Sequence, residues 1–155
     1  MDADFGAAST QTQKAWLPIL VGGGIAGTLD LISAFLTFGL GAPKAIAGGL
    51  LGRQAFQGGP ATYALGIALG FIVAIAAAAV FYAASRKLEF LKEHFLVSGL
   101  FDGIAIFLVM NLIVLPLSAL HAHGPYQLGE LIRGLLVHMF FIGLPISYSV
   151  RRFST

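Results

Sequence analysis

Three polar residues stand deep inside long apolar runs of the sequence: Asp30, Asn111 and His138. Each lies about ten residues from the end of its run, which is about 15 Å along a helix and near the middle of a bilayer. A charged side chain at that depth costs about 2.5–3.5 kcal/mol to insert. A carboxyl, an amide and an imidazole at one level could transfer protons or bind a cation, or could fix helix register through hydrogen bonds.

This buried polar layer has three open interpretations. Asp30 and His138 form a titrating pair that handles protons or cations, or the three side chains form a structural hydrogen-bonded trio, or Asp30 is simply protonated. We favour the two structural interpretations, because partners for Asp30 are plentiful. Asp30 also shares a helix face with Gly23 and Gly27, so we expect it to point toward other helices.

Asp102 is a further polar residue inside an apolar run. It lies nine residues from Asn111, which is half a turn out of phase, so the two side chains cannot face the same neighbour. We expect Asp102 to pair with Lys92 or Arg86, or to lie at a contact between copies of the chain.

Glu130 and Arg133 are three residues apart near the start of the last apolar run. This spacing predicts that they pair with each other, the alternative being that Arg133 reaches Asp30. His121 and His123 form a His-x-His sequence in the preceding loop, and Glu130 could supply a third metal ligand. We favour a solvated loop and predict no metal site.

The elements that position these residues are four apolar runs of spanning length, at 17–40, 61–84, 95–120 and 128–150. The chain is 57% hydrophobic and only 10% charged, whereas a soluble domain carries about 25% charged residues. Helices satisfy their own backbone in lipid, so the sequence predicts an all-α, polytopic membrane protein. We expect one four-helix domain over 17–153, after a short, loosely ordered tail at 1–16.

Small residues four apart mark one face of three of these runs. Such pairs allow close approach of helix backbones, so they predict a tight bundle. Pro116 and Pro145 lie late in the third and fourth runs and predict kinks. A weak parallel repeat of two helices plus two is visible where "LVGGGIAG" resembles "LVSGLFDG". The glycine pairs are Gly23 and Gly27, Gly66 and Gly70, and Gly99 and Gly103.

Basic residues are distributed unevenly between the two sides of the predicted membrane domain. The positive-inside rule therefore places both termini in the cytoplasm, in the inner membrane of a bacterium. The outer side then holds residues 41–60, in which we expect a short interfacial helix around 46–56, and the loop 121–127. On the inner side lie Lys14, Arg86, Lys87, Lys92, Arg151 and Arg152, and on the outer side Lys44 and Arg53.

The sequence argues against several function classes. It contains no cysteine, which excludes thiol nucleophiles, disulfides and cysteine-ligated metals. It has no G-x-S-x-G, H-E-x-x-H or phosphate-binding loop, so we predict that the protein is not an enzyme. A single intramembrane histidine argues against haem within one chain, and we expect no cofactor. No basic patch with interleaved aromatics indicates nucleic-acid binding.

Four stretches together resemble a family of small, uncharacterised four-helix proteins of the bacterial inner membrane: "AGTLDLISAF", "YAASRKLEFL", "MNLIVLPLSA" and "VHMFFIGLPISYSVRR". The resemblance runs from about Leu17 to Phe153 and implies a topology but no catalytic residues. We therefore expect a structural or accessory membrane protein that contacts lipid and binds itself or other membrane proteins. The alternative is a module that transports protons or a small solute, as an oligomer.

Overall fold

Most of the part of the chain that the structure describes is helical. This computed structural model describes residues 3–123 and 127–154, with side chains from residue 15 onward, and no strand occurs in these ranges. The elements, in chain order, are α1 (Ala3–Phe38), η1 (Gly39–Gly41), α2 (Ala42–Leu51), η2 (Gly52–Gln57), α3 (Pro60–Ser85), α4 (Phe90–Glu93), α5 (Phe95–Val109), η3 (Met110–Val114), α6 (Leu115–Leu117), α7 (Leu128–Val137), η4 (His138–Gly143) and α8 (Leu144–Phe153).

Four helical stretches are long and apolar enough to cross a membrane: Ala15–Gln57, Pro60–Ser85, Phe95–Leu117 and Leu128–Phe153. They coincide with the four predicted runs to within a few residues, apart from the first, which continues through α2 and η2. The third ends three residues early because Ser118 turns into an extended conformation and its hydroxyl donates to the Leu115 carbonyl at 2.7 Å.

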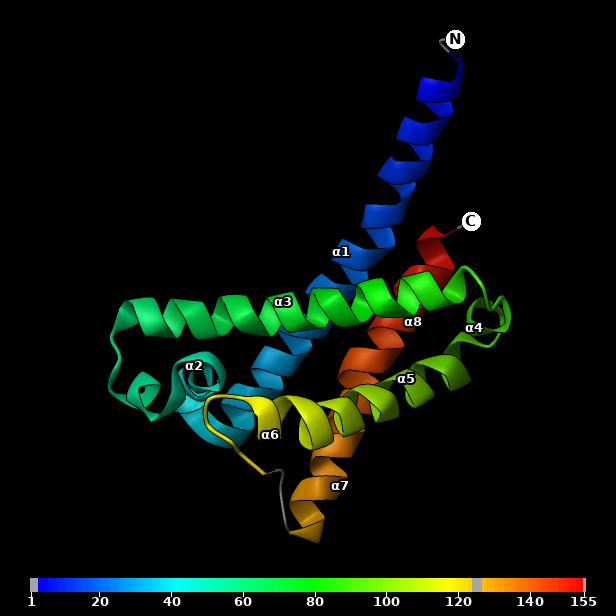
Figure 1. Ribbon diagram of the computed structural model, residues 1–155. Helices are drawn as coiled ribbons and strands as arrows, with labels where there is room; N and C mark the ends of the chain where they lie inside the picture. Colours follow the sequence, from blue (N-terminus) through cyan, green and yellow to red (C-terminus); the bar gives the residue numbers. More distant parts are fainter. Residues whose placement is uncertain (1–2, 124–126, 155) are drawn as a thin grey trace.

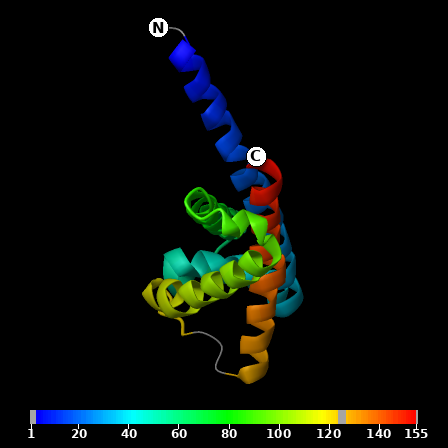
Figure 2. The same ribbon diagram turned by 90° about the vertical axis from the view of Figure 1, so that its right-hand side faces the viewer.

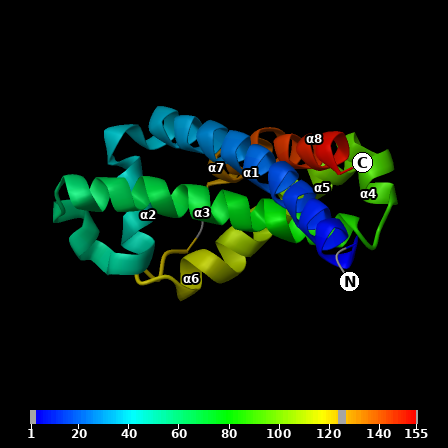
Figure 3. The same ribbon diagram turned by 90° about the horizontal axis from the view of Figure 1, so that it is seen from above.

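Helix α1 lies between two neighbours. It packs against α3 on one side and against α8 on the other, while α8 and η4 pack against α5 (Figure 1). The view from the side shows α8 running next to α1 (Figure 2). Seen from above, α4, the end of α8 and the beginning of α1 gather at one end of the molecule, and α2 lies at the other (Figure 3).

Helix α1 begins at Ala3 and therefore includes most of the segment 1–16 that is predicted as a tail. Its first turns extend away from the other helices (Figure 1). The stretch from Ala7 to Ala15 contains several strong helix formers, including alanines, glutamines and a lysine, so helix α1 can continue outward without tertiary support. Met1 and Asp2 lie outside the described residues.

The segment 41–60, which is predicted to lie on the outer side, packs against the other helices. Its helix α2 begins earlier than the predicted 46–56 and packs against α3. A side-chain carbon added at Gly66 of α3 would overlap the carbonyl of Pro43. The Ala119 amide donates to the Gly49 carbonyl at 2.8 Å, which ties α2 to the segment that follows α6.

Small side chains fill the interior and large ones cover the outside. The buried apolar residues include six alanines, among them Ala26, Ala74 and Ala78, which meet where α1 and α3 pack together. Large apolar side chains such as Leu36 and Leu117 are 83% and 79% exposed. This distribution is the reverse of a soluble core, and small residues at helix contacts are typical of membrane proteins.

The predicted small-residue faces lie at helix contacts. A side-chain carbon at Gly23 would come within 2.6 Å of the Ile75 backbone in α3, and one at Gly27 within 2.7 Å of the Phe71 ring. Gly99 and Gly103 of α5 face η4 and α8. Gly70 has the loosest fit, 3.8 Å from Ile46.

We predict that Gly143→Ala destabilises the protein by about 1–3 kcal/mol. The added methyl would overlap the Gly99 carbonyl and approach the Gly103 nitrogen to 2.6 Å, so two backbones would have to separate. Thermal unfolding in detergent, followed by circular dichroism, measures the change. Gly24→Ala is the matched control, since no atom lies within 4 Å of the added carbon. Equal stability of the two variants would contradict this close approach.

Candidate functional site

Asp30 and His138 lie near each other in the middle of the helix assembly. Asp30 is half-buried on α1, which packs against η4, the segment that begins at His138. No ion pair within 4.0 Å joins them in the described part of the chain. The two residues that the sequence suggested as a titrating pair are therefore neighbours without a direct contact.

His138 has one ring nitrogen in use and one available. Its Nδ1–H donates to the Gly134 carbonyl at 2.8 Å, one turn earlier in the same helix. The ring packs edge-on against Phe107 of α5, with centroids 5.4 Å apart. A neutral imidazole that donates through Nδ1 leaves Nε2 as an acceptor. Nε2 can therefore take a proton or accept a hydrogen bond.

The backbone at His138 is a π-helix instead of an α-helix. In η4 the Leu144 amide bonds to the Met139 carbonyl, five residues back. The Phe140 carbonyl would accept from the Leu144 amide in an α-helix and from an amide at position 145 in a π-helix. The Leu144 amide is already bonded to Met139 and Pro145 has no N–H, so the Phe140 carbonyl loses both donors. The proline predicted to kink this helix thus produces a π segment that begins at His138.

Asn111 lies in the corresponding segment of the third span. In η3 the Leu115 amide bonds to the Met110 carbonyl, and Pro116, which has no N–H, follows. The backbone carbonyl of Asn111 therefore loses the donors that positions 115 and 116 would provide in an α-helix and a π-helix. The side-chain Nδ2 donates to the Phe107 carbonyl at 2.9 Å, and Oδ1 is buried without a partner. Asn111 therefore has a buried side-chain oxygen that accepts no hydrogen bond from the described residues.

The three residues of the predicted polar layer do not form a mutual hydrogen-bonded trio among the described residues. Asn111 and His138 both bond to carbonyls four residues earlier in their own helices. This local bonding satisfies each group without a neighbour. Their hydrogen bonds therefore do not set the register between helices.

The other polar residues of the predicted spans do not form the predicted ion pairs within the described part of the chain. Glu130 and Arg133 are both exposed and form no ion pair with each other or with Asp30; exposed charges at a helix end gain little from pairing. Asp102 does not pair with Lys92 or Arg86, because it sits two turns inside α5. Its Oδ2 atom is buried with no hydrogen-bond partner.

The histidines of the outer loop do not gather a ligand set. Among the described residues no cluster of three His, Asp or Glu side chains could hold a metal ion. His121 and His123 are exposed, and Glu130 is exposed on α7. Residues 124–126 of the predicted loop lie outside the described residues.

Two serines that the sequence reasoning passed over make the hydrogen bonds between spans. Ser147 donates to the Phe95 carbonyl of α5 at 2.7 Å, and Ser149 donates to the Pro18 carbonyl of α1 at 3.0 Å. Both serines are fully buried. Two serines in an otherwise apolar helix are a usable signal, since serine is common at contacts between membrane helices.

Comparisons with known proteins give no relative. No protein family model matches the chain, no curated protein matches it, and no solved structure matches it.

We predict energetic coupling between Asp30 and His138. In a double-mutant cycle of Asp30→Asn and His138→Gln, the effects on unfolding free energy should depart from additivity by about 0.5–1.5 kcal/mol, because the two residues lie on packed elements and neighbouring groups couple. Unfolding free energies measured in mixed micelles give this departure from additivity. The control cycle pairs His138→Gln with Glu130→Gln, about 12 Å along the helix, and should be additive. Additivity in both cycles would refute the interaction.

Proposed function

We propose that this chain is an integral membrane protein of four transmembrane helices with a structural or accessory role. The observation that supports it most directly is the inverted distribution of side chains: alanines and glycines inside, large apolar side chains outside, on helices of spanning length. Such a surface would aggregate in water, and lipid is the solvent that fits it.

The accessory role is supported by the two cavities at the helix surfaces, both mainly apolar. One of about 500 Å³ lies between α3, α4 and α5, and one of about 520 Å³ lies between α1, α5 and α8. The second is lined by side chains such as Phe140, Leu144 and Tyr148. Apolar recesses of this kind fit lipid chains or the helices of another membrane protein, or of a second copy.

The orientation we propose has both termini in the cytoplasm of a bacterium. Arg151 and Arg152 end α8, and Arg86 and Lys87 begin the connection to α4, at the same end of the molecule (Figure 3). Arg151 stacks on the Phe95 ring at 4.5 Å, which holds one of these charges at that end. Positive charge concentrates on the cytoplasmic side of bacterial inner-membrane proteins.

We predict that cysteines introduced at Gln57 and Ala122 react with a membrane-impermeant maleimide in intact cells, whereas a cysteine at Glu89 does not. The physical reason is that the first two lie in the outer connections and the third in the basic inner one. The absence of native cysteine leaves no background. Lysed cells provide the control, in which all three should react. Labelling of Glu89→Cys in intact cells would reverse the orientation.

A second candidate function is proton or small-solute transport, favoured by the proximity of Asp30 and His138. An imidazole with a free Nε2 beside a carboxyl can pass a proton. Asn111 is a possible third polar group of such a path. Four helices enclose little volume, so transport would require an oligomer.

For the accessory role we predict that the purified protein in proteoliposomes carries no proton flux above empty liposomes under an imposed pH gradient. The ring that packs against His138 is the apolar ring of Phe107, and the residue one turn before Asp30 is the buried Ala26, so we expect no continuous polar path. A pH-sensitive dye inside the liposomes measures the flux. A flux that Asp30→Asn abolishes, with Asp102→Asn as the matched control, would instead establish the transport function.

A further inference from the structure

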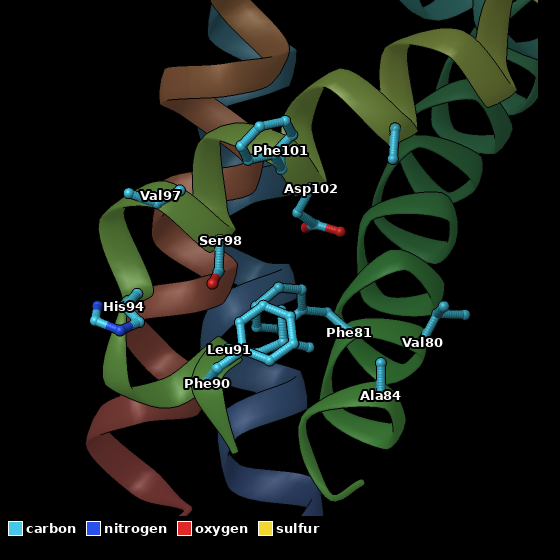
Figure 4. A pocket seen from close by; sticks show the side chains of 11 residues that line it. Val80, Phe81, Ala84, Phe90, Leu91, His94, Val97, Ser98, Phe101 and Asp102 are labelled. Atoms are coloured by element: carbon cyan, nitrogen blue, oxygen red, sulfur yellow. The ribbon is translucent and has the colours of Figure 1, made fainter. Parts of the chain in front are cut away.

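The cavity between α3, α4 and α5 combines an aromatic lining with one carboxyl group. Phe81 of α3, Phe90 of α4 and Phe101 of α5 contribute rings, and Asp102 contributes the acid. Its volume of about 500 Å³ is within the range of small-molecule sites. Figure 4 shows the Asp102 carboxyl projecting from α5 into the space between α5 and α3, toward Phe81.

The carboxyl group of Asp102 has no partner within the described residues. Its Oδ2 atom is buried without a hydrogen bond, and no described cation lies within ion-pair distance. The other polar lining groups, His94 and Ser98, lie nearer the α4 end of the cavity, with the imidazole turned away from Asp102 (Figure 4). A buried carboxylate without a partner is costly in a membrane, so the group either stays protonated or pairs with a cation or a donor.

We propose that this cavity binds a hydrophobic amine: a molecule whose protonated nitrogen pairs with Asp102 and whose apolar body lies among the phenylalanine rings. The ammonium supplies both the charge and the N–H donor that the Asp102 carboxyl group lacks among the described residues. The rings add cation–π attraction and apolar contact. The cavity opens beside the exposed side chains of Val80 and Val97, so such a molecule enters from the lipid phase.

The test uses a matched pair of probes, 4-phenylbutylamine and 4-phenylbutan-1-ol, with the full chain in lipid nanodiscs. Calorimetric titration, corrected with empty nanodiscs for partitioning into lipid, gives the affinity of each. We expect the amine to bind at least tenfold more tightly than the alcohol. Asp102→Asn should reduce amine affinity at least tenfold and leave alcohol affinity unchanged, since only the ion pair is lost. Asp30→Asn, a second intramembrane acid, should have no effect.

A second variant keeps the proposal testable if Asp102→Asn does not fold. Ala105 lines the same cavity and is exposed, so Ala105→Phe fills the site without disturbing a buried contact. It should abolish specific binding of both probes. The proposal is wrong if amine and alcohol bind equally, as they would in a cavity that only holds lipid, or if Ala105→Phe leaves amine binding intact. Each result is independent of membrane orientation and of transport.

Discussion

The contact on which most of this structure depends is the approach of two backbones, α5 and η4. Gly99 and Gly103 on one side and Gly143 on the other leave no room for a side-chain carbon. In the membrane that we propose for this protein, lipid is as apolar as leucine, so apolar burial would give little force between helices and van der Waals contact at short range would have to supply it. Dispersion attraction between atoms falls off within an ångström. Because these three glycines have no side chain, α5 and η4 come close enough for van der Waals contact to hold them together.

The same contact positions the polar residues. The carbonyl of His138 and the Cα of Met139 lie against Gly103, so the first residues of the π segment are fixed by α5. Phe107, one turn after Gly103, meets both the His138 ring and the Gly134 backbone. The packing of α5 against η4 therefore also sets the orientation of the His138 imidazole. Any change that separates these backbones also moves His138 relative to Asp30.

The four spans could be predicted from the sequence because apolar length is a local property that tertiary structure does not alter. The glycine pairs were also visible, but their partners were not: Gly66 faces Pro43 of α2, a segment predicted to lie at the interface. Gly143 was overlooked although Ser147 lies four residues on, which is a small-residue pair of the same kind. The π segments could not be predicted, since a proline specifies which hydrogen bond is lost and not how neighbouring carbonyls rearrange. The ion pairs predicted for Asp102 and Arg133 do not form within the described residues, because ion pairing depends on which groups solvent reaches.

The polar layer predicted from the sequence contributes little to holding the helices together. Asn111 and His138 bond to their own helices, and the hydrogen bonds between spans come from Ser147 and Ser149. Oδ1 of Asn111 and Oδ2 of Asp102 have no partner among the described residues. Each adds an insertion cost that no described contact offsets. Because small residues pack the helices, these polar groups are not needed for packing. The carboxyl group of Asp102 lines a cavity that is large enough to receive a small molecule.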